Sequence, residues 1–272
     1  MQTDALSGKT VVVKYGGNAM KNEQLKRAVV EDLVFFHKAG VRVILVHGGG
    51  PEIEAMLKAL SIESRFVDGL RYTDRRTMEV VQMVLCGRVN KDLTALIVQS
   101  GSAAIGLSGI DGGLLKAHKT VTGDFGFVGD IDAVNTALLD TLLDAGLLPV
   151  VSTVALNTEP GGPLSLNVNA DTAATSIACA MKAQKLVMMT DIAGILRTVS
   201  DPKSLIPRIA ASEIPRLKES GIISGGMIPK IDGAVKAAKH GVRDVLIIDG
   251  RVEHALRDAL LSGNKTGTTI TQ

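Results

Sequence analysis

The sequence predicts an α/β protein in which an open, mainly parallel central sheet carries helices on both faces, forming a three-layer sandwich. Short apolar runs rich in β-branched residues alternate with segments whose apolar residues recur every three or four positions. The runs are apolar throughout, as in strands that are buried on both faces. Two of them are followed within two residues by a glycine pair, which is typical of the loops that leave the carboxyl end of a parallel strand.

The first 60 residues show this pattern most clearly. A strand at 10–14 is followed by a helix whose apolar face runs from 25 to 36 and which ends at a glycine. A second strand, 41–46, runs into the glycine loop 47–51, whose proline suits the first turn of the next helix. Strand, helix, strand, loop and helix in this order predict parallel strands joined by crossover helices.

The rest of the chain continues the alternation, with one change of pattern. A long helical pattern is expected from 77 to 98, with Gly87 as a place for a bend, and residues 112–133 break into short strands that resemble hairpins. Further strands are expected at 103–107, 148–153, 186–189, 245–248 and, as an edge strand, 268–271; further helices are expected at 135–143, from about 171 to 181, at 212–219, from about 227 to 241 and at 253–261. A boundary near residue 184 divides the chain into an N-terminal lobe, 1–184, and a C-terminal lobe, 185–272.

Composition and charge exclude several classes of function. A net charge of +2 and an aromatic content of 3% offer neither the basic field nor the stacking platforms of nucleic-acid-binding proteins. No apolar run reaches about 18 residues, and no basic region precedes an apolar one at the N-terminus, so we expect neither a membrane span nor a signal peptide. Cys86 and Cys179 are expected as reduced, mostly buried thiols of a cytoplasmic protein.

The end of the first strand is the first candidate for an anion site. Lys14 closes a buried strand, where an unpaired ammonium group has a desolvation cost, and Gly16 and Gly17 follow it. Adjacent glycines let backbone N–H groups turn toward one point, so a phosphate or carboxylate site is indicated, although a tight turn beside a solvated lysine has the same sequence. Gly48 and Gly49 follow the second strand and should open at the same edge of the sheet.

Further candidates lie later in the chain. Lys230 lies near the N-terminus of the helix that follows Gly226, an unfavourable place for a cation unless an anion binds nearby or the side chain is solvated. Asn167 and Asn169 are two residues apart, so in an extended segment both amides face one side. Asp171 lies at a helix start and could simply cap that helix. The planar guanidinium of Arg71 could bind a carboxylate ligand or form a surface ion pair. Asp191 follows a strand and could cap a turn or face a nucleotide.

Known phosphate and metal signatures do not fit the chain. The tripeptide 8–10 resembles the end of a P-loop, but the first glycine of that motif is missing and a strand follows the tripeptide instead of preceding it. No dinucleotide-binding glycine pattern occurs. No zinc-ligand spacing occurs either, so no metal ion held by protein ligands is expected. Two lysines, one aspartate and amide-rich loops instead favour phosphoryl transfer, which depends on positioning and charge stabilisation. A carboxylate acceptor is already ionised at pH 7 and needs no general base.

On these residues the chain resembles the amino acid kinase family over nearly its whole length. The motifs that carry the resemblance are Lys14-Tyr15-Gly16-Gly17-Asn18, His47-Gly48-Gly49-Gly50-Pro51, Gly69-Leu70-Arg71-Tyr72-Thr73-Asp74, Asn167-Val168-Asn169-Ala170-Asp171 and Gly225-Gly226-Met227-Ile228-Pro229-Lys230. Within the family they are most similar to the members that use ATP to phosphorylate the side-chain carboxylate of N-acetyl-L-glutamate in arginine biosynthesis. The resemblance also implies an open sheet between helix layers, an N-terminal acceptor lobe and a C-terminal nucleotide lobe.

The resemblance implies a role for each candidate residue. Lys14 and Lys230 would neutralise the transferring phosphoryl group, and Asp171 would hold both lysines. The residues implied in acetylglutamate binding are Gly16, Gly17, Gly48, Gly49, Arg71, Asn167 and Asn169. Those implied in ATP binding are Thr190, Asp191, Gly194, Ile195, Ile222, Ile223, Ser224, Gly226 and Met227, with Mg²⁺ held mainly by the ATP phosphates.

The resemblance implies a homodimer. Arginine-inhibited hexameric members carry an extra N-terminal helix, and because only about nine residues precede the first strand, that helix is not expected here. The alternatives are a sister kinase acting on carrier-bound aminoadipate, aspartate, carbamate or UMP, a non-catalytic nucleotide-binding regulator and, more remotely, an oxidoreductase. Lys14, Asp171 and Lys230 together argue against the regulator, because a sensor needs no charge relay.

Overall fold

A computed structural model describes residues 3–17, 20, 22–67, 69–198, 200–261 and 266–272. Asn18 of the first glycine motif lies outside the described residues. The strands are β1 (Thr10–Tyr15), β2 (Arg42–His47), β3 (Phe66–Val67), β4 (Leu70–Arg71), β5 (Ala104–Gly109), β6 (Leu115–Lys119), β7 (Gly129–Val134), β8 (Leu148–Asn157), β9 (Ser165–Asn167), β10 (Lys185–Thr190), β11 (Arg208–Ala210), β12 (Asp244–Asp249) and β13 (Thr268–Thr271). The α-helices are α1 (Glu23–Lys38), α2 (Gly50–Ala59), α3 (Arg75–Gln82), α4 (Asn90–Gln99), α5 (Thr136–Asp144), α6 (Ala170–Ala180), α7 (Ile214–Glu219), α8 (Met227–Lys239) and α9 (Ala255–Leu261).

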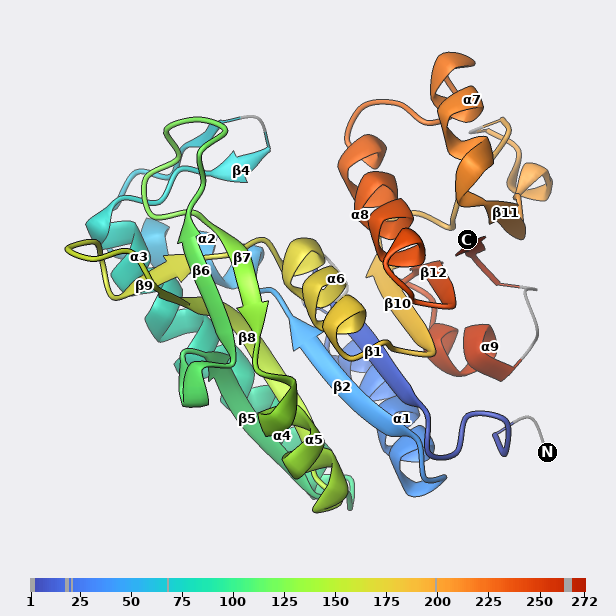
Figure 1. Ribbon diagram of the computed structural model, residues 1–272, viewed down its shortest axis with the longest axis horizontal. Coiled ribbons are helices and arrows are strands. Elements are labelled where there is room, and N and C mark those ends of the chain that lie inside the picture. Colours follow the sequence, from blue (N-terminus) through green and yellow to red (C-terminus); the bar gives the residue numbers. More distant parts are fainter. Residues whose placement is uncertain (1–2, 18–19, 21, 68, 199, 262–265) are drawn as a thin grey trace.

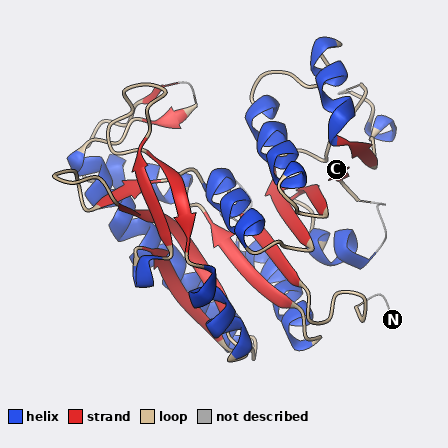
Figure 2. Cartoon of the chain, in the orientation of Figure 1, coloured by secondary structure: helices blue, strands red, loops and turns tan. Residues whose placement is uncertain are grey.

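One large sheet runs through the molecule. Its described strands lie in the order β11-β13-β12-β10-β1-β2-β8-β6-β7, and β5 and β9 also pair with β8. The central ladders between β12, β10, β1, β2 and β8 are all parallel, while β6–β7, β8–β9 and β12–β13 are antiparallel. The α/β class with a mainly parallel sheet is therefore confirmed, as is the hairpin in the segment 112–133 (Figures 1 and 2).

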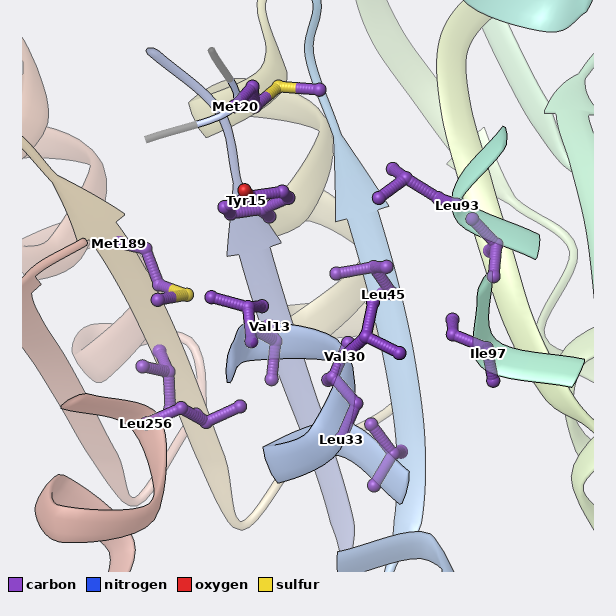
Figure 3. Packing of buried hydrophobic residues seen from close by; sticks show 14 of the residues in the cluster. Val13, Tyr15, Met20, Val30, Leu33, Leu45, Leu93, Ile97, Met189 and Leu256 are labelled. Atoms are coloured by element: carbon purple, nitrogen blue, oxygen red, sulfur yellow. The ribbon is translucent and has the colours of Figure 1, made fainter. Parts of the chain in front are cut away.

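Helices cover both faces of the sheet because its strands are apolar on both faces. Side chains from alternate positions of β1 enter two separate hydrophobic clusters, Val11 and Val13 in one and Val12 in the other. The first cluster packs β1, β2 and β10 against α1, α4 and α9 (Figure 3). The second packs the opposite face against α5, α6 and α8, which lie in front of the sheet in Figure 1.

The N-cap of α6 differs from the simplest reading of the sequence. Asn169, and not Asp171, caps the helix: its Oδ1 accepts from the backbone N–H groups of Asp171 (2.8 Å) and Thr172 (3.2 Å). An amide at this position satisfies two of the donors that a helix start leaves without partners. The carboxylate of Asp171, one residue inside the helix, is thereby left to other partners.

The helix expected from 77 to 98 is present as an unbroken helical stretch from 75 to 99, in which a π-helical segment, Met83–Val89, lies between α3 and α4 and contains Gly87. One other expectation needed correction. Strand β13 is not an edge strand, because β11, drawn from the polar segment after residue 200, pairs in parallel with its outer side. Among the described helices, none combines the length and apolar character needed to cross a membrane.

Candidate active site

The candidate site lies where the carboxyl ends of β1 and β2 meet the starts of α6 and α8. A cleft of about 510 Å³ opens at this edge of the sheet. Lys14, Asp171 and Lys230 line it together with every residue predicted to bind acetylglutamate, namely Gly16, Gly17, Gly48, Gly49, Arg71, Asn167 and Asn169. Residues far apart in the sequence thus converge on one site, as parallel strand ends are expected to do.

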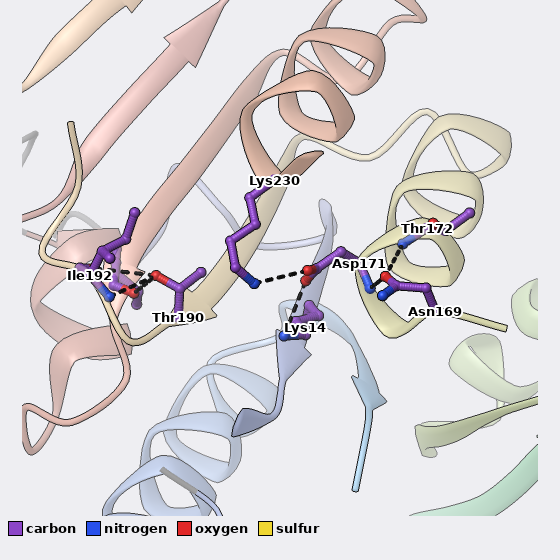
Figure 4. Close-up of polar contacts among 8 residues, drawn as sticks. Lys14, Asn169, Asp171, Thr172, Thr190, Ile192 and Lys230 are labelled. Carbon is purple, nitrogen blue, oxygen red and sulfur yellow. Dashed lines mark hydrogen bonds and ion pairs between the residues drawn. The ribbon is translucent and has the colours of Figure 1, made fainter. Parts of the chain in front are cut away.

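Asp171 bridges the two lysines. Lys14 Nζ lies 3.0 Å from Asp171 Oδ1, and Lys230 Nζ donates to Asp171 Oδ2 at 3.1 Å (Figure 4). Burial would raise the pKa of the Asp171 carboxyl, but the two ammonium groups outweigh it and hold that pKa below its usual value. Two cations with one anion leave a net positive charge, which suits a ligand rich in negative charge.

The glycines of the first loop let Lys14 and the neighbouring chain approach closely. A Cβ on Gly16 would lie 3.3 Å from Lys14 Nζ, and one on Gly17 would lie 3.2 Å from Asp191 Oδ1. Gly17 also has a φ of +76°, a conformation that side chains rarely adopt. The loop backbone after β1 therefore packs closely on the side chain of Asp191, which follows β10.

The second glycine loop is used differently from our expectation. The N–H of Gly48 donates to Tyr15 O at 3.0 Å and extends the β1–β2 ladder, so it does not offer a donor to a ligand. Gly49 packs so closely on the π-helical turn that a Cβ would lie 2.6 Å from Leu85 Cδ2. His47, which precedes the loop, is fully buried, and burial lowers its pKa to about 4, so its imidazole is neutral at pH 7.

Arg71 forms the opposite wall of the cleft and is almost fully buried. Its Nη1 donates to Glu54 Oε2 at 2.7 Å and to Ser64 Oγ, and its Nη2 donates to Gly50 O at 3.3 Å. The guanidinium carbon lies 4.6 Å from the ring centroid of Phe66. The hydrogen bond from Arg71 lowers the pKa of Glu54, so this partner stays ionised near neutral pH. Arg71 is thus a fixed cation in the wall of the cleft and not a freely solvated side chain.

The nine residues predicted to bind ATP are all described, and none of them lines the cleft. Thr190 ends β10, and its hydroxyl bonds Ile192 N (3.2 Å) and Ile248 O (3.3 Å). Ile195 and Ile223 are buried in the core. Their side chains are therefore not exposed for the contact with the nucleotide that was expected of them. The more accessible members are Asp191, Ile222, Ser224, Gly226 and Met227, and Gly194 is buried beside Thr268.

Sequence reasoning missed several residues that line the cleft. Thr153 ends the strand expected at 148–153 and follows Ser152, which pairs with His47 at the end of β2, so the argument used for the glycine loops could have found it. Phe66, Glu54, Leu85 and Val128 carried no local signal, because their place depends on how α2, the π-helical turn and the β6–β7 hairpin pack. Among the described residues, no group of three or more His, Cys, Asp or Glu is placed to hold a metal ion.

Comparison with known proteins decides the family. The sequence pattern that defines the amino acid kinase family matches residues 9–249. The chain belongs to the amino acid kinase family. The expected family is thereby confirmed.

Similar proteins agree with this assignment. An acetylglutamate kinase of Clostridium kluyveri is 49% identical over 264 residues, which cover 97% of this chain and 92% of that protein. One from Carboxydothermus hydrogenoformans is 47% identical over 274 residues, again with 97% and 92% coverage. The solved structure of N-acetylglutamate synthase from Neisseria gonorrhoeae, complexed with coenzyme A and N-acetyl-glutamate, superposes with a TM-score of 0.84 at 26% identity; the match covers all of this chain but only 61% of that one.

Proposed function

We propose that this chain catalyses the ATP-dependent phosphorylation of the side-chain carboxylate of N-acetyl-L-glutamate, a step of arginine biosynthesis that yields an acyl phosphate and ADP. The observation that carries the proposal is the Lys14–Asp171–Lys230 bridge at one end of a cleft whose wall holds Arg71. The proposal is also supported by relatives named acetylglutamate kinase that match nearly the whole chain.

The substrate fits the charges of the cleft. Acetylglutamate carries two carboxylates, and the guanidinium of Arg71 suits one of them through charge-assisted hydrogen bonds. The other would then lie toward Lys14, with Asn167 on the wall between; the Nδ2 of Asn167 donates to Thr73 Oγ1 at 3.1 Å. The apolar members of the lining, such as Phe66 and Leu85, suit the acetyl group and the methylene chain of the substrate.

The chemistry needs charge stabilisation and no general base. The acceptor carboxylate is ionised at pH 7 and attacks the γ-phosphorus of ATP directly. Lys14 and Lys230 then stabilise the negative charge on the transferring group and on the leaving ADP oxygen, while Asp171 keeps both ammonium groups in place. Mg²⁺ enters with ATP, bound mainly by its phosphates.

The proposed activity also assigns a different substrate to each of the two lobes. We assign acetylglutamate binding and dimerisation to 1–184 and ATP binding to 185–272, which contains Thr190, Asp191 and the segment 222–227. The assembly proposed is a homodimer, and the location proposed is the cytoplasm.

A coupled ADP-release assay tests the proposed function. ATP·Mg²⁺ is offered with N-acetylglutamate, glutamate, aspartate, carbamate and UMP in separate reactions. Turnover with N-acetylglutamate alone is expected. Turnover only with another acceptor would refute the substrate, and no turnover with any acceptor while ATP still binds would favour a carrier-bound substrate or a regulator.

A further inference from the structure

A buried polar chain lies beneath the second glycine loop. His47, the last residue of β2, places Nδ1 2.9 Å from the carbonyl oxygen of Gly48 and Nε2 3.1 Å from Asn90 Nδ2. A carbonyl can only accept, so Nδ1 carries the proton and Nε2 accepts from the amide of Asn90. Both side chains are fully buried, so water does not compete for these hydrogen bonds.

Asn90 is itself fixed on the sheet. As the first residue of α4, it also donates from Nδ2 to Val150 O at 2.8 Å, so its two N–H groups serve Val150 and His47, and Leu107 O lies 3.2 Å from the same nitrogen. Its Oδ1 accepts from Lys91 Nζ at 3.1 Å. Gly106 leaves the room for this arrangement, because a Cβ there would lie 2.1 Å from Asn90 Oδ1. Asn90 therefore holds His47 in a fixed position relative to strands β5 and β8.

The hydrogen bonds from Asn90 to His47 and from His47 to Gly48 set the direction of one peptide group of the loop. Gly48 is held on both sides, since its N–H donates to Tyr15 O and its carbonyl accepts from His47. The peptide between Gly48 and Gly49 is trans, and in a trans peptide the C=O and the next N–H point in opposite directions. With the carbonyl turned toward the buried imidazole, the N–H of Gly49 points away from the imidazole, and Gly49 itself lines the cleft.

We propose that His47 and Asn90 are positioning residues that aim the N–H of Gly49 at an oxygen of the bound substrate or of the transferring phosphoryl group. The inference rests on the proposed function only for the identity of that ligand. Neither residue touches the ligand; both act through the Gly48–Gly49 peptide. Of the two amides first expected from Gly48 and Gly49, this assigns the active one to Gly49.

Two amide variants of His47 separate this role from simple packing. In His47→Asn, Nδ2 is bonded to Cγ as the imidazole Nδ1 is, so the donor to Gly48 O is retained and the contact with Asn90 is lost. In His47→Gln, the amide lies one bond farther out, so the contact with Asn90 is kept and the donor to Gly48 O is lost. Because one aligned oxyanion donor is worth about 100- to 1000-fold in kcat, a misdirected one should lower kcat about 30- to 100-fold in His47→Gln, against less than about threefold in His47→Asn.

The comparison is made at equal folded concentration, with KM and thermal unfolding measured for both variants. A role confined to packing would lower the melting temperature of both and leave kcat similar in the two. Equal kcat values for His47→Asn and His47→Gln, at any level, would therefore overturn the inference.

A second measurement on the unaltered protein does not depend on turnover. Two-bond ¹H–¹⁵N NMR of the histidine side chains reports which ring nitrogen of His47 carries the proton. The Nδ1–H tautomer, unchanged from pH 6 to 8, is expected, and an Nε2–H tautomer would overturn the inference. If the wild-type protein phosphorylates none of the acceptors, the proposed function fails, and the tautomer still tests the orientation of the peptide.

Discussion

Replacing Lys14 by methionine removes one of the two charges beside Asp171 while keeping most of the side-chain volume. Lys14 is nearly buried at the end of β1, so a shorter residue would also open a cavity, which Lys14→Met avoids. Lys230 keeps its bond to Asp171, and Arg71 lies at the opposite wall of the cleft. Acetylglutamate should therefore still bind, and the loss should fall on the chemical step.

The magnitude follows from the contact distance of this ammonium group. Lys14 Nζ approaches a carboxylate oxygen to 3.0 Å in the structure, and a phosphoryl oxygen would be met at a similar distance. Two unit charges about 3 Å apart interact by about 5 kcal/mol at an effective dielectric constant of about 20, and only the part that develops in the transition state counts toward catalysis. We take the part that develops in the transition state as about 3 kcal/mol. Losing it corresponds to roughly a 100-fold loss of kcat, which matches the usual contribution of a single electrostatic group.

The assay is the coupled ADP-release assay with both substrates varied. Lys185→Met is the matched control, because Lys185 also makes a partly buried ion pair, 2.9 Å from Asp244, but at the opposite end of β10. The control should keep kcat within about threefold of wild type, because Lys185 does not line the cleft and Asp244 keeps a second partner, Arg208, at 3.3 Å. A kcat for Lys14→Met within threefold of wild type, or an equal loss in both variants, would refute the assigned role.

Three further predictions follow from the site. Arg71→Ala should raise the KM for acetylglutamate about 10- to 100-fold, because a hydrogen bond to a charged group is worth about 1.5–3 kcal/mol, with a smaller effect on kcat; an unchanged KM would remove Arg71 from the substrate site. Gly49→Ala forces a Cβ to within 2.6 Å of Leu85 and should lower the unfolding free energy by about 1–3 kcal/mol in urea titrations. In Gly50→Ala the new Cβ meets open space, so a loss as large as that of Gly49→Ala would contradict the packing argument. Finally, the lowered pKa of Asp171 means that its charge stabilises the fold above the unfolded-state pKa of about 3.9 and that this contribution is lost as the pH falls through the folded-state pKa. The difference in unfolding free energy between wild type and Asp171→Asn should shrink from pH 7 toward pH 3; a difference independent of pH would contradict this.

Sequence patterns were sufficient where a property depends on neighbouring residues. The strand ending in Lys14 and the glycines after it predicted an anion site, because burial, charge and backbone freedom are all local there. Parallel strands then explained why the loop after β2 opens beside the loop after β1. In both cases a short segment carries the whole physical argument.

Other features could not be predicted because they depend on contacts between distant segments. Asp171 and Asn169 are equally good N-caps by type, and only the positions of the two lysines show which residue is free for the bridge. The amide of Gly48 was expected at the ligand but continues the ladder to Tyr15. Strand β13 was expected at the edge because the short β11 carries too weak a pattern to be recognised alone.

The pairing of β1 with β10 has a consequence for how the chain can be divided. Residues 11–14 pair in register with 185–188, across the proposed lobe boundary near residue 184, and Val12 and Val13 are almost completely inaccessible to water. A fragment ending near residue 184 would leave one side of β1 as an open, apolar edge, which is a template for aggregation. The two lobes should therefore unfold in a single cooperative transition, and neither should be obtained as an independent folded fragment.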